Sequence, residues 1–275
     1  MKNKKNFLVI GNPIKHSLSP LLHNYWFHKN KINCEYKKLK TTQAEIKKIL
    51  TKVRKKEIEG INVTIPFKNS IIRHLDILKG DALKTSSVNT VYLNKKKLVG
   101  ENTDVYGFSY GVIKKVTNRI KTAGIIGAGG VTSSIILALI QKGVKKIYIT
   151  NRTFSKLKIF QKKFKKIIYP IKWNDRYKFF RNAQILINVT SLGMLGQKDL
   201  KFDFSIFDKK INVVDIIYNP ENTRFLKDAR KNGHKTFSGL DMFIYQAQKA
   251  FYIWNNKNPK ITKDIYKKLR KKING

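Results

Sequence analysis

Short apolar runs alternate with longer amphipathic stretches through the first hundred residues of the chain. The predicted elements are a strand at 7–11, a helix from Pro20, a strand at 34–39, a helix at 44–54, a strand at 60–64, and a hairpin of strands 91–93 and 97–99. Because strands and helices alternate before the hairpin, this half is predicted to be an α/β unit with a mostly parallel sheet.

The second half starts the same pattern again. Strands are predicted at 122–126, 146–150, 185–188, 211–215 and near 236–237, with a helix at 133–141, further helices between the later strands, and tail helices at 241–254 and 261–273. This order predicts a second doubly wound unit of the mononucleotide-binding type. No low-complexity linker separates the halves, so a short hinge or helix is expected to join them.

The charge balance raises the question of a nucleic-acid partner. The chain has 275 residues, of which 41% are hydrophobic, and its 58 Lys and Arg exceed its 17 Asp and Glu by 41. Of the 58 cations, 49 are Lys, and Asn is also abundant at 24. A nucleic-acid surface more often concentrates its cations and mixes Arg with stacking aromatic residues. We therefore interpret the charge as a lysine-rich solvated surface and predict no specific nucleic-acid partner.

Several other classes are excluded by simple counts. The single cysteine, Cys34, cannot form an internal disulfide. No apolar run approaches the roughly 18 residues of a membrane span, and no secretory signal is evident. The five histidines show no metal-ligand spacing with acids or with the cysteine, so no metal site is predicted. A cytoplasmic protein without a membrane partner is expected.

A glycine turn stands between the first strand and helix of the second unit. The run Gly127-Ala128-Gly129-Gly130-Val131 lets the backbone approach a pyrophosphate, which the following helix N-terminus would face. Thr132 stands at the third glycine position of the usual pattern, so the match is partial. A tight strand–helix turn without a ligand is the alternative.

The end of the next strand indicates which dinucleotide would bind. An NAD site places Asp or Glu there to hold the ribose 2′-hydroxyl. This chain has Asn151-Arg152-Thr153 instead, with Lys156 shortly after. The Arg side chain can neutralise a 2′-phosphate, which favours NADP. An ordinary capped helix start is the alternative, but it does not explain the missing acid.

Three polar clusters in the first half indicate a binding site for a small polyhydroxylated substrate. They are residues 11–20 with His16 and two serines, residues 62–68 with Asn62, Thr64 and Lys68, and residues 87–90 together with 100–104, which include Asn89, Asn102 and Asp104. Each cluster alone is compatible with turn or cap chemistry. Together they supply one ammonium, one carboxylate and many short hydrogen-bonding groups at strand ends.

These stretches identify a resemblance that covers nearly the whole chain. The sequence resembles the shikimate dehydrogenase family. The matching segments are GNPIKHSLSPLLHN at 11–24, NVTIPFK at 62–68, VNT at 88–90, GENTDVYG at 100–107, GAGG at 127–130, NRT at 151–153, NVTSLGM at 188–194, DIIYNPENT at 215–223 and GLDMFIYQ at 239–246. Two positions depart from the family pattern: Ser133 replaces a frequent Arg after the glycine turn, and Trp254-Asn255-Asn256 replaces Trp followed by a small residue and Gly.

The resemblance implies a role for each matching site residue. Lys68 and Asp104 would be the catalytic pair. The substrate-binding residues would be Ser17 and Ser19 at the carboxylate, with Thr64, Lys68, Asn89, Asp104, Tyr218 and Gln246 around the ring. The NADP-binding residues would be Gly127, Ala128, Gly129, Gly130, Val131, Asn151, Arg152, Thr153 and Lys156, with Ile216 and Gly239 at the nicotinamide through their backbones.

The implied fold is two doubly wound α/β domains: a substrate domain at 1–103, a Rossmann-type NADP domain at 104–239, and C-terminal helices at 240–275 that return to the first. The implied activity is NADP-dependent, reversible reduction of 3-dehydroshikimate to shikimate, a step of aromatic amino acid biosynthesis, by a monomer or homodimer. A quinate/shikimate dehydrogenase with broader substrate or cofactor use is the close alternative. A non-catalytic, basic nucleic-acid-binding protein is the distant one.

Overall fold

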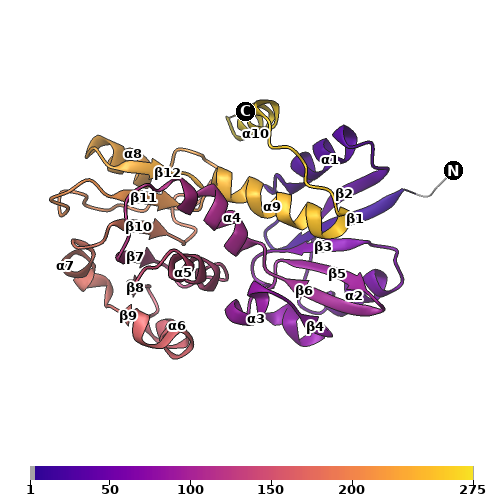
Figure 1. Cartoon of the computed structure of the whole chain (residues 1–275), viewed down its shortest axis with the longest axis horizontal. Helices are drawn as coiled ribbons and strands as arrows, with labels where there is room; N and C mark the ends of the chain where they lie inside the picture. The colour runs from indigo at the N-terminus through magenta and orange to yellow at the C-terminus, as the bar shows by residue number, and fades with distance from the viewer. Residues whose placement is uncertain (1–3, 275) are drawn as a thin grey trace. The chain divides into compact units, whose positions relative to one another are not determined.

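The computed structural model describes residues 4–274 and divides into two compact units. The first contains the chain up to Gly107 together with Ile244–Ile273, and the second contains Phe108–Phe243. The chain passes from one unit to the other inside two helices, α4 (Asp104–Gly111) and α9 (Gly239–Asn255). Each unit has its own six-stranded sheet (Figure 1). The α/β fold class predicted from the sequence is confirmed.

The first unit is built on a mixed sheet with the strand order β2-β1-β3-β5-β6-β4. Its elements are β1 (Lys5–Gly11), α1 (Ser19–Lys29), β2 (Cys34–Lys40), α2 (Ile46–Arg54), β3 (Gly60–Val63), β4 (Ile77–Leu78), α3 (Asp81–Thr85), β5 (Thr90–Asn94) and β6 (Lys97–Glu101), followed after the second unit by most of α9 and by α10 (Lys263–Asn274). Strands β2, β1 and β3 are parallel, whereas β5 runs antiparallel to both of its neighbours.

The pairing register brings several chain segments to one edge of this sheet. Parallel pairing of Ile10 with Val63 places the ends of β1 and β3 side by side. Antiparallel pairing sets Asn62 of β3 opposite Thr90, and Thr90 opposite Glu101 of β6. The residues that follow β1, β3 and β6, and those that precede β5, therefore all lie at the same edge of the sheet.

The second unit has an all-parallel sheet with the strand order β12-β11-β10-β7-β8-β9. Its elements are β7 (Thr122–Ile126), α5 (Thr132–Gln141), β8 (Lys146–Thr150), α6 (Leu157–Phe164), β9 (Ile168–Pro170), α7 (Arg176–Phe180), β10 (Ile185–Asn188), β11 (Asn212–Asp215), α8 (Arg224–Lys231) and β12 (Lys235–Phe237). The order reverses between β7 and β10, which is the position where a doubly wound sheet binds its ligand.

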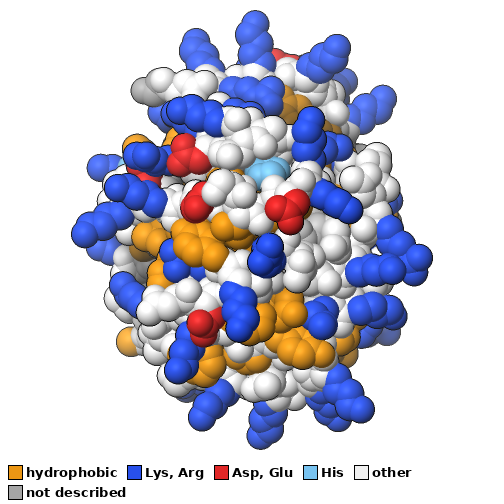
Figure 2. All heavy atoms as spheres, turned by 90° about the vertical axis from the view of Figure 1, so that its left-hand side faces the viewer, with side chains coloured by type: hydrophobic (Ala, Val, Ile, Leu, Met, Phe, Trp, Pro, Cys, Tyr) orange, Lys and Arg blue, Asp and Glu red, His pale blue; other side chains and the backbone are white. Residues whose placement is uncertain are grey.

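Each unit buries its own core. Helix α2 contributes Ile46, Ile49, Leu50 and Val53, which lie on one helical face and are buried against the first sheet. The core of the second unit is rich in phenylalanine, with Phe180, Phe202, Phe204, Phe207 and Phe225 in one cluster. Lysine and arginine side chains are spread over the face drawn in Figure 2 rather than gathered in one patch.

An aromatic cluster ties α9 to the first unit. It consists of Phe7, His23, Trp26, Phe27, Tyr36, Phe251 and Trp254. Trp254 lies so close to Gly60 that a Cβ atom there would fall 2.5 Å from the indole Nε1 atom. Because α9 packs through these rings, the C-terminal segment shares a hydrophobic core with β1, β2 and α1.

Candidate active site

A buried ion pair lies at the strand-end edge of the first sheet. Lys68 follows β3, and its carbonyl accepts a hydrogen bond from the Val88 backbone N–H over 2.8 Å. Asp104 is the first residue of α4, where its own N–H donates to the Asn102 side chain. The Lys68 Nζ atom lies 2.6 Å from Asp104 Oδ2, and the two side chains are only 12% and 6% exposed. This burial distinguishes Lys68 from the exposed lysines that dominate the composition.

Asn89 connects this ion pair to other polar side chains. Its Nδ2 atom donates to Asp104 Oδ1 over 2.9 Å and lies 3.4 Å from Gln246 Oε1 on α9. Its Oδ1 atom accepts from the Thr103 backbone N–H over 2.8 Å, which fixes the orientation of the amide. The structure thus brings four predicted site residues together in one hydrogen-bonded group: Lys68, Asn89, Asp104 and Gln246.

The two serines and Thr64 lie after the neighbouring strands β1 and β3. Ser17 Oγ accepts from the Ser19 backbone N–H over 3.4 Å, and Ser19 begins α1. Thr64 lies against the last residue of β1, since a Cβ on Gly11 would overlap Thr64 Cγ2. Small hydroxyl side chains therefore lie at the same sheet edge as the ion pair, and they can donate hydrogen bonds to an anion.

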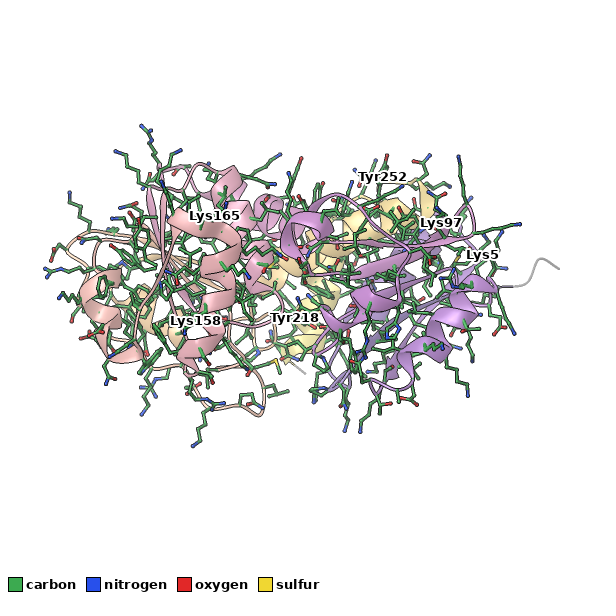
Figure 3. The ribbon with its side chains drawn as sticks, turned by 90° about the horizontal axis from the view of Figure 1, so that it is seen from below. Lys5, Lys97, Lys158, Lys165, Tyr218 and Tyr252 are labelled. Carbon is green, nitrogen blue, oxygen red and sulfur yellow. The ribbon has the colours of Figure 1, made fainter. Side chains whose placement is uncertain are left out.

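Tyr218 belongs to the second unit. It lies between β11 and α8 and is labelled in Figure 3. Its ring stacks on Phe243 with centroids 4.5 Å apart and an interplanar angle of 27°. The structure places Tyr218 in a different unit from the other predicted substrate-binding residues.

The glycine turn of the second unit fits a dinucleotide phosphate. Gly127 directly follows β7 with φ of +116°, and a Cβ there would fall 2.7 Å from Thr190 Cγ2, so only glycine is tolerated. Around Gly129 a Cβ would meet only one neighbour, at 3.7 Å, so this part of the turn has open space. The turn continues through Ala128, Gly130 and Val131 into α5.

The start of α5 supplies a second observation in favour of an anionic ligand. Val131 is the N-cap residue, and it provides no capping side-chain hydrogen bond within the described part of the chain. The Thr132 hydroxyl is buried and has no hydrogen-bond partner among residues 4–274. Uncapped N–H groups at a helix start carry the positive end of the helix dipole and suit a phosphate group.

The segment after β8 presents cationic and polar groups without an acid. Asn151 Nδ2 donates to the carbonyl of Thr153 over 2.9 Å, which shapes the turn. Arg152, Thr153 and Lys156 are exposed there. No Asp or Glu occupies the position that would hold a ribose 2′-hydroxyl, so the residues present fit a 2′-phosphate and hence NADP.

Ile216 and Gly239, the two residues predicted at the nicotinamide, lie against each other in the second unit. A Cβ on Gly239 would fall 1.9 Å from the Ile216 carbonyl oxygen, and the Gly239 N–H donates to the Ile217 carbonyl over 2.9 Å. The backbone at the start of α9 therefore packs directly on the segment after β11, and any side chain at position 239 would force them apart.

Asp215 is a buried acid beside this segment that sequence reasoning did not assign. It accepts hydrogen bonds from Thr223 Oγ1 (2.8 Å), the Ile217 N–H (3.1 Å) and Asn188 Nδ2 (3.1 Å). Burial raises the pKa of this carboxyl to about 6, although all three hydrogen bonds lower it. Asp215, the last residue of β11, thus connects Ile217 and Thr223 of the following segment to Asn188 at the end of β10 through hydrogen bonds.

Among residues 4–274 no helix is long and apolar enough to cross a membrane. Within the same range, no group of three or more His, Cys, Asp or Glu side chains could hold a metal ion.

Comparison with known proteins agrees with the folds of both units. A crystal structure of shikimate dehydrogenase from Aquifex aeolicus is 32% identical, with a TM-score of 0.87 over 100% of both chains. A crystal structure of shikimate 5-dehydrogenase from Thermus thermophilus, in complex with NADP(H) and shikimate, is 27% identical, with a TM-score of 0.85 over 98% of each chain. These neighbours define the class as two-domain α/β dehydrogenases.

Sequence comparison identifies the family. The profile of the shikimate dehydrogenase substrate binding domain matches residues 9–91, and that of shikimate / quinate 5-dehydrogenase matches residues 112–222. A relative from Pelagibacter ubique, named shikimate dehydrogenase (NADP(+)), is 46% identical over 259 residues, which cover 94% of this chain and 96% of the relative. The chain belongs to the shikimate dehydrogenase family, which confirms the resemblance inferred from the motifs.

Proposed function

We propose that this chain is an NADP-dependent shikimate dehydrogenase that reversibly reduces the ring ketone of 3-dehydroshikimate to the hydroxyl of shikimate. The observation that carries the proposal is the buried pair of Lys68 and Asp104, with Nζ and Oδ2 2.6 Å apart, bonded through Asn89 to Gln246. A buried charge pair surrounded by neutral hydrogen-bonding groups suits a hydroxylated ring that carries a ketone or hydroxyl at the reacting carbon.

Lys68 is the proton-transfer group in this proposal. Reduction adds a hydride, which NADPH supplies when bound, to the carbonyl carbon, and the carbonyl oxygen must then gain a proton. The Lys68 ammonium donates that proton and becomes a neutral amine; in the reverse direction the neutral amine accepts the proton of the hydroxyl. Asp104 holds the ammonium in place through Oδ2, while Oδ1 receives a hydrogen bond from Asn89.

Neutral side chains hold the substrate in the proposed site. Ser17 and Ser19 donate hydrogen bonds to the substrate carboxylate, and Thr64, Asn89 and Gln246 bind it and its hydroxyls. Lys68 and Asp104 contact the reacting oxygen and a neighbouring hydroxyl, and Tyr218 contributes from the second unit. Because hydrogen bonds to charged groups are stronger than neutral ones, the serines supply a large share of substrate affinity.

Cofactor binding is assigned to the second unit. The turn at residues 127–131 and the start of α5 hold the pyrophosphate, Asn151 and Thr153 bind the adenosine end, and Arg152 and Lys156 neutralise the 2′-phosphate. Ile216 and Gly239 bind the nicotinamide through backbone groups. The close packing of Gly239 on Ile216 supports this last role, because it places these two backbone segments side by side.

The domain roles follow from these assignments. Residues 1–103 form the substrate domain, residues 104–239 the NADP domain, and residues 240–275 the C-terminal helices that complete the first. The biosynthetic reaction and the single cysteine favour a cytoplasmic location, and the expected assembly is a monomer or homodimer.

The test is an absorbance assay at 340 nm of NADP reduction by the purified chain, with shikimate and quinate each supplied beside NADP and NAD. The proposal predicts turnover of shikimate with NADP, and slower turnover in the other three combinations. Equal rates with quinate or NAD would favour a broader quinate/shikimate dehydrogenase. Salt-dependent retention on DNA without any turnover would favour the nucleic-acid-binding alternative.

A further inference from the structure

A run of hydrogen bonds continues from the ion pair into the core of the first unit. Asn89 Oδ1 accepts from the Thr90 hydroxyl over 3.1 Å, and Thr90 Oγ1 accepts from Asn62 Nδ2 over 3.1 Å. Asn62 Oδ1 in turn accepts from the Tyr36 hydroxyl over 2.7 Å. Asn62 and Thr90 are directly paired residues of β3 and β5, so the sheet register itself sets this contact.

The donor direction along this run is fixed. Asn62 Nδ2 also donates to the Asn89 carbonyl, which can only accept, so Asn62 Oδ1 must face the Tyr36 hydroxyl. Thr90 already accepts from Asn62, and its single proton faces Asn89 Oδ1 at 3.1 Å rather than the more distant Thr103 Oγ1 at 3.5 Å. Every proton in the run therefore points toward Asp104, and each bond polarises the next in the same sense.

Tyr36, at the far end, is held rigidly. Its backbone N–H and carbonyl both bond to the Asn24 side chain, at 2.8 and 2.9 Å. Its ring stacks on His23 with centroids 4.3 Å apart and an interplanar angle of 4°. Tyr36 is 1% exposed and Thr90 is 0% exposed, so water cannot replace a hydroxyl that is removed from either side chain.

Resting on the proposed function, we infer that Tyr36 and Thr90 are positioning residues of the reaction, acting through Asn62 and Asn89 to hold the Asp104 carboxylate against Lys68. Neither hydroxyl is assigned to substrate. Asn89 and Asp104 each have further partners, so loss of one link loosens the geometry without abolishing the site.

The test compares kcat for shikimate oxidation in Thr90→Val, Thr90→Ser, Tyr36→Phe and the Tyr36→Phe/Thr90→Val double variant. Loss of one neutral hydrogen bond predicts roughly a 3- to 10-fold lower kcat in each single hydroxyl deletion. The serine variant should recover most of the rate, and the double variant should be no slower than Thr90→Val alone, because both changes break the same run. The KM for NADP, which is bound by the other unit, should stay within about twofold of wild type.

Tyr92→Phe is the matched control. Tyr92 lies on the same strand as Thr90, and its hydroxyl donates to Glu101 over 2.7 Å. Its removal deletes one tyrosine hydroxyl and its hydrogen bond from the same unit, so Tyr92→Phe should lower the Tm but leave kcat unchanged. The Tyr36 and Tyr92 pair tests the inference even if Thr90→Val fails to fold.

Three results would overturn the inference while leaving the proposed function intact: a kcat for Tyr36→Phe equal to that of Tyr92→Phe, multiplicative losses in the double variant, or no recovery in Thr90→Ser. A wild-type chain that binds NADP but does not oxidise shikimate would instead overturn the proposed function, and this inference with it.

Discussion

Replacing His23 with phenylalanine should make the first unit more resistant to acid. His23 is fully buried in the aromatic cluster, and neither ring nitrogen has a hydrogen-bond partner within the described residues. Burial disfavours the charged imidazolium and lowers the pKa of His23 to about 3. Phenylalanine is close in shape to the imidazole and has nothing to protonate.

The magnitude follows from linkage between protonation and folding. The unfolded chain binds a proton at His23 below pH about 6.5, whereas the folded chain does not do so until pH about 3. The stability that neutral His23 contributes is therefore complete above pH about 6.5 and falls as the pH drops toward 3. Each pH unit in this window costs about 1.4 kcal/mol, so at pH 4.5 the wild type should have lost about 2.7 kcal/mol through this one residue.

Urea unfolding at pH 7.5 and pH 4.5 measures this effect. The free energy of unfolding of His23→Phe, minus that of wild type, should be about 2–3 kcal/mol more positive at pH 4.5 than at pH 7.5. His28→Gln removes an exposed histidine from the same helix and is the matched control. A His23→Phe difference that is the same at both pH values would refute the reasoning, and would mean that the buried imidazole is protonated or becomes hydrated.

Three further changes test separate parts of the account. Arg152→Ala should raise the KM for NADP far more than that for NAD, and equal effects in steady-state kinetics would show that Arg152 does not bind the 2′-phosphate. Ser17→Ala should weaken shikimate binding by roughly 1.5–3 kcal/mol in a titration while NADP affinity stays unchanged; unchanged shikimate affinity would remove Ser17 from the site. Burial raises the pKa of Asp215 to about 6 in the folded chain, above its value in the unfolded chain. The free energy of folding that the neutral carboxyl contributes is therefore complete below pH about 4 and is lost as the pH rises through 6. The free energy of unfolding of Asp215→Asn, minus that of wild type, should thus rise by up to about 3 kcal/mol between pH 4 and pH 7.5. Urea unfolding that shows no such pH dependence would mean that burial does not raise the pKa of Asp215.

The sequence predicts the strands best where apolar residues form an uninterrupted run. The strands predicted at 122–126, 146–150 and 185–188 match β7, β8 and β10 to the residue. The sequence pattern does not predict β4 and β9, whose two and three residues are too few to show a period, although it does place the equally short β12 near 236–237. Asn256 directly follows the last residue of α9 and adopts a left-handed backbone with φ of +49°, a conformation that asparagine tolerates after a helix.

The candidate site is predictable as a set of motifs but not as a set of contacts. Lys68 and Asp104 are 36 residues apart, and Asn89 and Gln246 are 157 apart, so no local pattern reports that these side chains meet. No sequence pattern indicates that the Tyr36 hydroxyl is connected to the candidate site, since an aromatic residue in a strand normally serves only packing. Asp215 lay inside a matching motif, but its burial depends on the segment that folds over it.

The most direct test of the central claim is the turnover number of Lys68→Met with shikimate and NADP. Methionine keeps the length of the side chain but cannot transfer a proton. Lys97→Met, at an exposed lysine on β6 that is labelled in Figure 3, is the matched control and should leave the rate unchanged. We expect Lys68→Met to fold, to bind shikimate with only modestly changed affinity, and to turn over about two to four decades more slowly. A Lys68→Met variant that turns over at near the wild-type rate would show that Lys68 is not the proton-transfer group, and that another group or water transfers the proton.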